Sequence, residues 1–284
     1  MSIIPDSEYV CSLSQAALAK AREELREDPD TRLAHVCRLR RRLQQEQGLN
    51  ARTDVLYLLP PLRASKYDQD RAFTLVTNLY KMKRKRPDLF QHLKPSTVRD
   101  VIDRGVCEVL EQRDSEGCRV VLMRIGKCAA KQSAFLDLVK TVMVIVAKSL
   151  EEEETQVHGI RFLILLQGTT LSHLGQLRPG FLHLTKALVQ DVAPVRLKHL
   201  DFFHEPLFFG AAFKLLKGIL RTKLVRRVHL HGSRFDRLHS VMPASCLPRD
   251  LGGTLEAGGT TPWTEALFAS EWMFEEALQY GYVT

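Results

Sequence analysis

Long hydrophobic runs are missing from this sequence of 284 residues. No apolar stretch reaches the roughly 18 residues that a membrane-spanning helix needs, so we expect no transmembrane segment. The first residues, MSIIPDSEYV, lack a basic segment followed by a long apolar one, which argues against a secretory signal. The six cysteines form no CxxC pair, and without an export signal they are expected to be reduced and mostly buried. The predicted compartment is the cytoplasm.

The motifs of several enzyme classes are missing as well. There is no GxGxxG after a predicted strand, no GxxxxGK[ST], no GxSxG and no HExxH. His229 and His231 would share one face of a strand, but no third ligand is spaced to join them, so a structural role is expected. The acidic run Glu151 to Glu154 is interpreted as a charged helix end at the surface. We therefore expect no enzymatic activity, no metal and no cofactor.

The most informative stretch is an apolar segment with cationic flanks. Leu207 to Leu220 is predicted to form a helix that is hydrophobic almost all round, interrupted mainly by Lys214 and Lys217. Between 194 and 239 there are ten Lys/Arg and three Asp/Glu, in a chain whose formal charge is +8. The flanking cations are Arg196, Lys198, Arg221, Lys223, Arg226 and Arg227. This pattern suits a hydrophobic flap that opens at an anionic membrane surface.

The periodicity predicts an α/β fold. Residues 1–97 are expected to form an all-helical N-terminal region, in which Pro60 and Pro61 must end or kink a helix. Residues 98–284 are expected to form a largely parallel sheet flanked by helices, because strands alternate with helices there. The expected strands are 120–125, 160–166, 197–203 and 227–231, and the expected helices between them are 132–154, 176–191 and 207–220.

Several segments resemble the CRAL-TRIO lipid-binding family, most of all its tocopherol- and retinaldehyde-binding members. The similarity is carried by LKHLDFFHEPLFFGAAFKLLKGILRTKLVRRVHLHGS and by LPRDLGG at Leu247 to Gly253. It extends to ETQVHGIRFLILLQG, to DSEGCRVVLMRIG, to DVLYLLPPLRASKYD and to the tail around Glu271 and Trp272, covering about residues 30–280. The spacing of Glu205-Pro206, His231-Gly232 and LPxxxGG is the specific part.

The resemblance implies a lipid cavity between sheet and helices, closed by a mobile lid helix at about Leu207 to Leu220. It also implies a site for a phosphatidylinositol phosphate headgroup beside the lid. The positions that carry this implication are all basic here: Arg196, Lys198, Lys223 and Arg227. A fifth cationic position of the family, in the N-terminal region, aligns with Ser65 and is lost.

Other departures from the family pattern concern the pocket. Two serines that hold the polar end of the ligand in tocopherol-binding members align with Val142 and Val146. A common acidic residue aligns with Leu165, and an aromatic one with Thr169. The pocket is therefore expected to be drier than a tocopherol pocket. Its expected lining residues are Val139, Val142, Met143, Val146, Ile164, Leu166, Phe203, Phe209 and Phe213.

The preferred interpretation is a cytoplasmic carrier that transfers a small hydrophobic ligand, tocopherol-, retinoid- or similar lipid-like, between membranes. Its expected partners are that ligand and anionic membranes containing phosphatidylinositol phosphates, with the carrier at membranes only transiently. One alternative is a lipid-sensing adaptor without net transfer. Another is a nucleic-acid binder using residues 221–227 and Lys81 to Arg86, where five of six residues are basic. That run lacks aromatic residues for base stacking, so a solvated helix end, and no nucleic-acid partner, is expected.

Overall fold

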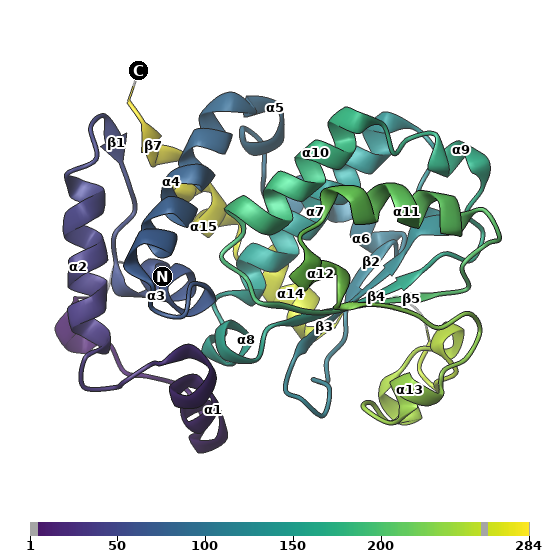
Figure 1. Ribbon diagram of the computed structural model, residues 1–284, viewed down its shortest axis with the longest axis horizontal. Coiled ribbons are helices and arrows are strands. Elements are labelled where there is room, and N and C mark those ends of the chain that lie inside the picture. The colour runs from purple at the N-terminus through teal and green to yellow at the C-terminus, as the bar shows by residue number, and fades with distance from the viewer. Residues whose placement is uncertain (1–4, 257–260, 284) are drawn as a thin grey trace.

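A five-stranded sheet forms the centre of the computed structural model, which describes residues 5–256 and 261–283 (Figure 1). Its order is β2-β3-β4-β5-β6, with β2 antiparallel to β3 and the other pairs parallel. The mostly parallel α/β sheet expected from the sequence is confirmed. The strands are β2 (Cys107–Val109), β3 (Arg119–Arg124), β4 (Ile160–Leu165), β5 (Leu197–Phe203) and β6 (Val228–Leu230).

The helices that connect the parallel strands cover one face of this sheet (Figure 1). From β3 to β6 each strand is placed beside the previous one in the same direction, and right-handed crossovers then put every connection on the same side. A cavity between sheet and helices has to form on that face. The connecting helices are α7 (Gln132–Ser149), α8 (Glu153–His158), α9 (Leu171–Leu174), α10 (Pro179–Ala187), α11 (Phe209–Ile219) and α12 (Thr222–Val225), and a π-helical turn (Leu188–Val192) continues α10.

The segment after β6 covers the other face of the sheet. It contains α13 (Asp236–His239) and ends in the LPRDLGG sequence. Side chains of Leu122, Leu163 and Phe203 pack there against Leu247 and Leu251. Gly253 is required in this turn because a Cβ atom would collide with the backbone of Leu247. The family-like motif therefore closes the core on the side away from the connecting helices.

Helices from both ends of the chain complete the molecule. A two-stranded antiparallel sheet of β1 (Leu49–Asn50) and β7 (Gly281–Tyr282) ties the C-terminal segment to the N-terminal helices. The N-terminal helices are α1 (Gln15–Lys20), α2 (Arg32–Gln44), α3 (Val55–Ala64), α4 (Gln69–Lys85) and α5 (Pro87–Phe90). They are followed by α6 (Pro95–Asp103), and α14 (Pro262–Phe268) and α15 (Glu271–Glu276) come near the end of the chain. The boundary predicted at residues 97–98 falls within α6, and the division into two regions stays a prediction.

Two sequence expectations are wrong at particular elements. Of the two outcomes expected at Pro60 and Pro61, the one in which the helix ends there is wrong: α3 runs through both prolines, held by packing of Leu58, Leu59 and Leu62 in the N-terminal core. The helix expected over 132–154 stops at Ser149, and the acidic run that follows is not simply a surface end.

A buried ion-pair network explains the acidic run. Glu153 is 5% exposed, and its carboxylate lies 2.9 Å from the guanidinium of Arg63, whose side chain is fully buried. The same guanidinium pairs with Glu27 at 2.8 Å, while Tyr9 donates a hydrogen bond of 2.9 Å to Glu153. The network therefore joins α3, α8 and the N-terminal segment. An unpaired charge at this depth would be strongly destabilising.

Candidate functional site

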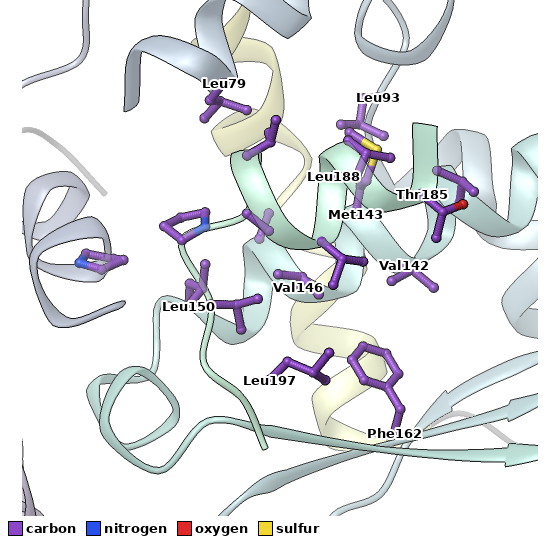
Figure 2. Close-up of a pocket in the computed structure, with 18 of the residues that line it drawn as sticks. Leu79, Leu93, Val142, Met143, Val146, Leu150, Phe162, Thr185, Leu188 and Leu197 are labelled. Atoms are coloured by element: carbon purple, nitrogen blue, oxygen red, sulfur yellow. The ribbon is translucent and has the colours of Figure 1, made fainter. Parts of the chain in front are cut away.

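A cavity of about 990 Å³ lies between the sheet and the connecting helices. This is the upper end of the size range of ordinary ligand pockets, roughly 300–1,000 Å³. Figure 2 shows Val142 and Val146 of α7 facing Phe162 and Leu197 of the sheet across this space. Its walls are dominated by aliphatic and aromatic side chains, which favours a hydrophobic guest.

The α7 side of the cavity is a single helical stripe. Val139, Val142, Met143 and Val146 are spaced by three, one and three residues, so they share one face of the helix, and all four line the cavity. The predicted lining residues Ile164, Leu166, Phe209 and Phe213 line it too.

Phe203 is misplaced in the sequence prediction. It lies on the opposite face of the sheet, where its ring stacks on His231 with 4.7 Å between centroids. Its neighbour Phe202 lines the cavity instead. Successive side chains of a strand point to opposite faces, so an expectation that is one residue off selects the wrong face.

Polar side chains in the cavity wall near α9 and α10 are already engaged by the backbone. The hydroxyl of Thr169 donates to the carbonyl of Leu166 at 2.7 Å, and that of Thr185 donates to Phe181 at 3.0 Å. His173 Nε2 lies 2.9 Å from the carbonyl oxygen of Cys128. Leu165, where the family pattern has an acidic residue, is buried on the other face of the sheet. Val142, Val146 and Thr169 are thus the departures that lie in the cavity wall, and the hydroxyl of Thr169 is already used by the backbone.

The cavity extends beyond the sheet domain, which the sequence analysis missed. Leu79 and Leu93 lie beyond Leu188 on the side away from the sheet, and they pack with Met143 (Figure 2). Side chains from three further elements line the same space: Leu56, Tyr57, Pro60 and Pro61 of α3, Leu75, Val76 and Tyr80 of α4, and Trp272, Met273 and Phe274 of α15. In the sequence, this extension of the cavity was indicated by the apolar face of α4 at Ala72, Leu75, Val76 and Leu79.

Helix α11 lies beside α10 on the side of the sheet that carries the connecting helices (Figure 1), and its inward side chains line the cavity. Phe209 and Phe213, one helical turn apart, face inward, and the Phe209 ring lies 5.1 Å from that of Phe202. Lys214 and Lys217 are exposed on the outside. Leu207, directly before the helix, is completely exposed. The helix therefore has an apolar inner side and a cationic outer side, with a hydrophobic residue in water at its base.

The Glu205-Pro206 and His231-Gly232 motifs anchor this base. The Glu205 carboxylate accepts a hydrogen bond of 3.0 Å from the backbone N–H of His231, and the backbone N–H of His204 donates to Gly232 at 2.7 Å. His231 Nε2 also lies 2.8 Å from Asp201. These contacts hold the ends of β5 and β6 together at the point where the chain leaves β5 and leads into α11.

Among the described residues no cluster of three metal-ligating side chains is found.

The four predicted headgroup residues come together at the other end of β5 and β6. Arg196 and Lys198 lie at the start of β5, Lys223 on α12, and Arg227 directly before β6. The backbone N–H of Leu200 donates to the carbonyl of Arg227 at 2.9 Å, which places these two strands side by side. Neither Lys223 nor Arg227 has a carboxylate within ion-pair distance in the part of the chain that the structure describes.

The local electrostatics reflect this gathering of positive charge. The pKa of Lys223 is lowered by partial burial and by the positive charges of Arg227, Lys66, Arg71 and Arg196. Burial and the charge of Arg196 likewise lower the pKa of Arg227. A cluster of cations that repel one another is stabilised when an anion binds among them.

Lys66 and Arg71 add to this positive charge, and the sequence analysis missed both. Ser65, at the position where the family has a cation, is buried at the end of α3. Lys66 follows it with a left-handed backbone, φ 56°, and its side chain is exposed. Both cations lie near enough to Lys223 to lower its pKa. The adjacency of Lys66 to Ser65 was the available signal.

The basic run at the end of α4, Lys81 to Arg86, contacts the C-terminal segment. Lys83 donates hydrogen bonds to the carbonyls of Ala277 at 2.7 Å and Tyr280 at 2.5 Å, and Arg84 lies over the ring of Tyr282 at 4.8 Å. The run therefore holds the C-terminal segment against α4.

No helix in the described parts of the chain is long and apolar enough to span a membrane.

The chain belongs to the CRAL/TRIO family, whose members bind and transfer hydrophobic lipids. The CRAL/TRIO domain profile matches residues 103–253, and the expected family membership is confirmed.

Individual relatives agree with this assignment. The chain is 36% identical to alpha-tocopherol transfer protein-like of Homo sapiens over 264 residues, 93% of this chain and 77% of that protein. It is 28% identical to clavesin-1 of Rattus norvegicus, over 93% of this chain and 75% of the relative. The crystal structure of Sfh5 superposes with a TM-score of 0.53 at 10% identity, covering 93% of this chain and 99% of Sfh5. The last comparison concerns the fold alone.

Proposed function

We propose that this protein is a cytoplasmic carrier that holds a tocopherol-, retinoid- or similar lipid-like molecule in the cavity and transfers it between membranes. The observation that carries the proposal is a large apolar cavity covered by α11, which has the exposed Leu207 at its base, the exposed Lys214 and Lys217 on its outside, and α12 with Lys223 after its other end. Withdrawing a chain of about fifteen methylenes into water costs about 12 kcal/mol, at about 0.8 kcal/mol per methylene. A carrier avoids this cost because the ligand passes from one apolar environment to another.

Docking is proposed to use Arg196, Lys198, Lys223 and Arg227 on phosphatidylinositol phosphate headgroups. Each cation near an anionic surface contributes about 1 kcal/mol, so four contribute about 4 kcal/mol, which suits a transient contact. Helix α11 acts as the lid. Its inner side, with Phe209 and Phe213, would enter the membrane interface when the lid opens, together with Leu207, which already faces water.

The test measures bound lipid and transfer separately. Mass spectrometry of lipids extracted from the purified protein identifies the guest, and a fluorescent analogue of it reports vesicle-to-vesicle transfer. The double substitution Lys223→Glu and Arg227→Glu should reduce transfer from phosphoinositide-containing vesicles at least tenfold and leave the bound lipid in place, because the cavity is untouched.

The matched control is Lys81→Glu with Lys85→Glu, the same change of charge on exposed residues of α4. An equal loss of transfer in both variants would mean that net charge, not this site, recruits the protein. A bound lipid without any transfer would favour the lipid-sensing adaptor. A protein that binds no lipid would refute the carrier.

A further inference from the structure

Glu24 lies against two of the four cations of the proposed headgroup site. It belongs to the π-helical turn Ala21–Leu25 that continues α1. This helix is held on α8 by a small apolar cluster in which Leu13, Ala17, Ala21 and Leu25 pack around Val157. The packing fixes where the Glu24 side chain points.

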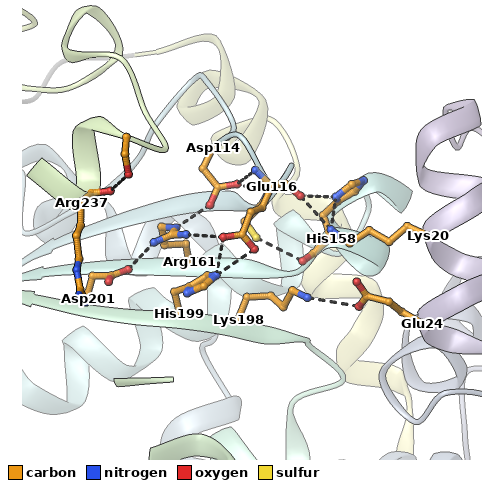
Figure 3. Close-up of polar contacts among 12 residues, drawn as sticks. Lys20, Glu24, Asp114, Glu116, His158, Arg161, Lys198, His199, Asp201 and Arg237 are labelled. Atoms are coloured by element: carbon orange, nitrogen blue, oxygen red, sulfur yellow. Dashed lines mark hydrogen bonds and ion pairs between the residues drawn. The ribbon is translucent and has the colours of Figure 1, made fainter. Parts of the chain in front are cut away.

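One carboxylate oxygen serves both cations. Oε2 of Glu24 lies 2.5 Å from Nη2 of Arg196 and 3.4 Å from Nζ of Lys198, and Figure 3 shows the second of these contacts. Partial burial by itself would raise the pKa of Glu24, but the hydrogen bond from Arg196 and the charges of Lys198, Arg196 and Lys20 lower it to about 2. The carboxylate is therefore charged at neutral pH.

The site is consequently divided. Arg196 and Lys198 share the single negative charge of Glu24, while Lys223 and Arg227 have no carboxylate partner among the described residues. Lys66 and Arg71 add further positive charge on the unneutralised side. A phosphate that bridges both halves has to take the place of the Glu24 carboxylate.

We propose that Glu24 is an internal competitor for the phosphoinositide headgroup, so that membrane binding at Arg196 and Lys198 releases the helix of residues 15–25 from that site. The inference rests on the proposed headgroup site. A multiply charged phosphate wins this exchange because it carries more charge than a carboxylate and accepts more hydrogen bonds from Arg and Lys. A membrane that lacks such headgroups leaves the contact closed.

The test compares Glu24→Gln with Glu23→Gln. Glu23 is the exposed neighbour of Glu24 and has the same charge. Binding to phosphatidylcholine vesicles containing phosphatidylinositol bisphosphate is measured by sedimentation. Two partly exposed ion pairs predict a gain of roughly two- to tenfold in affinity for Glu24→Gln and no gain for Glu23→Gln. Equal affinities of Glu24→Gln and the wild type would overturn the inference.

Hydrogen exchange of the wild-type chain provides a readout that does not depend on a variant. Backbone amides of residues 17–25 should exchange faster with bisphosphate vesicles than with phosphatidylcholine vesicles, and unchanged exchange would contradict the release. A faster exchange with soluble inositol bisphosphate but not with vesicles would overturn the membrane as the competing partner. The two proposals can fail separately. If the wild type binds bisphosphate vesicles no more tightly than phosphatidylcholine vesicles, the proposed docking fails. If it binds them more tightly and Glu24→Gln has the same affinity as the wild type, only the role of Glu24 fails.

Discussion

Val142 and Val146 are the residues at which this cavity departs most clearly from the pattern of tocopherol-binding relatives. Both line the cavity on the α7 stripe, opposite Phe162 and Leu197. A ligand hydroxyl placed against them loses its hydrogen bonds to water, at a cost of about 1–3 kcal/mol. We therefore expect the natural guest to present hydrocarbon, not a hydroxyl, to this part of α7.

The substitution Val142→Ser tests this expectation. A new hydroxyl at this position should strengthen binding of a hydroxylated lipid by about 0.5–1.5 kcal/mol, the net value of a hydrogen bond, and should not strengthen binding of the methyl ether of the same lipid. Competitive displacement of a fluorescent guest measures both. A gain for the ether as large as that for the alcohol would show that cavity shape, not hydrogen bonding, changed.

At the scale of the element, α11 combines two surfaces with different expected roles. Phe213 lies on the inner side and lines the cavity, whereas Leu207 at its base is completely exposed. An exposed leucine that enters a membrane gains about 1.5–3 kcal/mol. Retention of the guest and delivery to a membrane should thus depend on different residues of the same segment.

The pair Phe213→Ser and Leu207→Ser separates these roles. Phe213→Ser should release bound lipid roughly tenfold faster, which corresponds to about 1.4 kcal/mol. Leu207→Ser should keep normal retention in solution and reduce the rate of transfer to vesicles severalfold. Stopped-flow release and vesicle transfer are measured for both variants, each serving as the control for the other. Normal retention in Phe213→Ser would mean that α11 does not close the cavity.

For the molecule as a whole, the buried network of Arg63 connects the N-terminal helices to the sheet domain. Glu27 and Glu153 both contact its guanidinium. Burial alone would raise the pKa of each carboxylate, but Arg63 lowers both below the ordinary value of 4.5. The stability that these groups provide is present above pH 4.5 and is lost as pH falls toward their lowered pKa values, because the unfolded chain takes up protons first.

Urea unfolding at several pH values should show this dependence. The free energy of unfolding should fall steeply below about pH 4.5. Glu153→Gln should cost about 1.5–3 kcal/mol at pH 7, since Arg63 keeps Glu27, and should flatten the acid dependence. Glu151→Gln, a neighbouring change at a surface ion pair with Lys148, should cost less than about 1 kcal/mol. Equal losses in the two variants would contradict the assignment of Glu153 to the buried network.

Local pattern was sufficient for the four parallel strands β3 to β6, though not for β2, and for much of the cavity wall. Strands β3 and β4 are short apolar runs between turn signals, and the valines of α7 recur at helical spacing, so their existence follows from periodicity. The apolar segment 207–220 and its cationic flanks stood out for the same reason, because charge and hydropathy are properties of neighbouring residues.

Long-range contacts decided the rest. The continuation of α3 through Pro60 and Pro61, the burial of Glu153 and the pairing of Glu24 with Arg196 each depend on partners far away in the chain. The face on which Phe203 lies depends on a one-residue register that hydropathy does not resolve, because Phe202 and Phe203 are equally apolar neighbours. By itself, then, the sequence determined most of the helices, the four parallel strands and the basic flanks of the apolar segment 207–220. Only the tertiary structure decided which charges are neutralised and how far the cavity extends, because burial and ion pairing are set by residues that meet only in the folded chain.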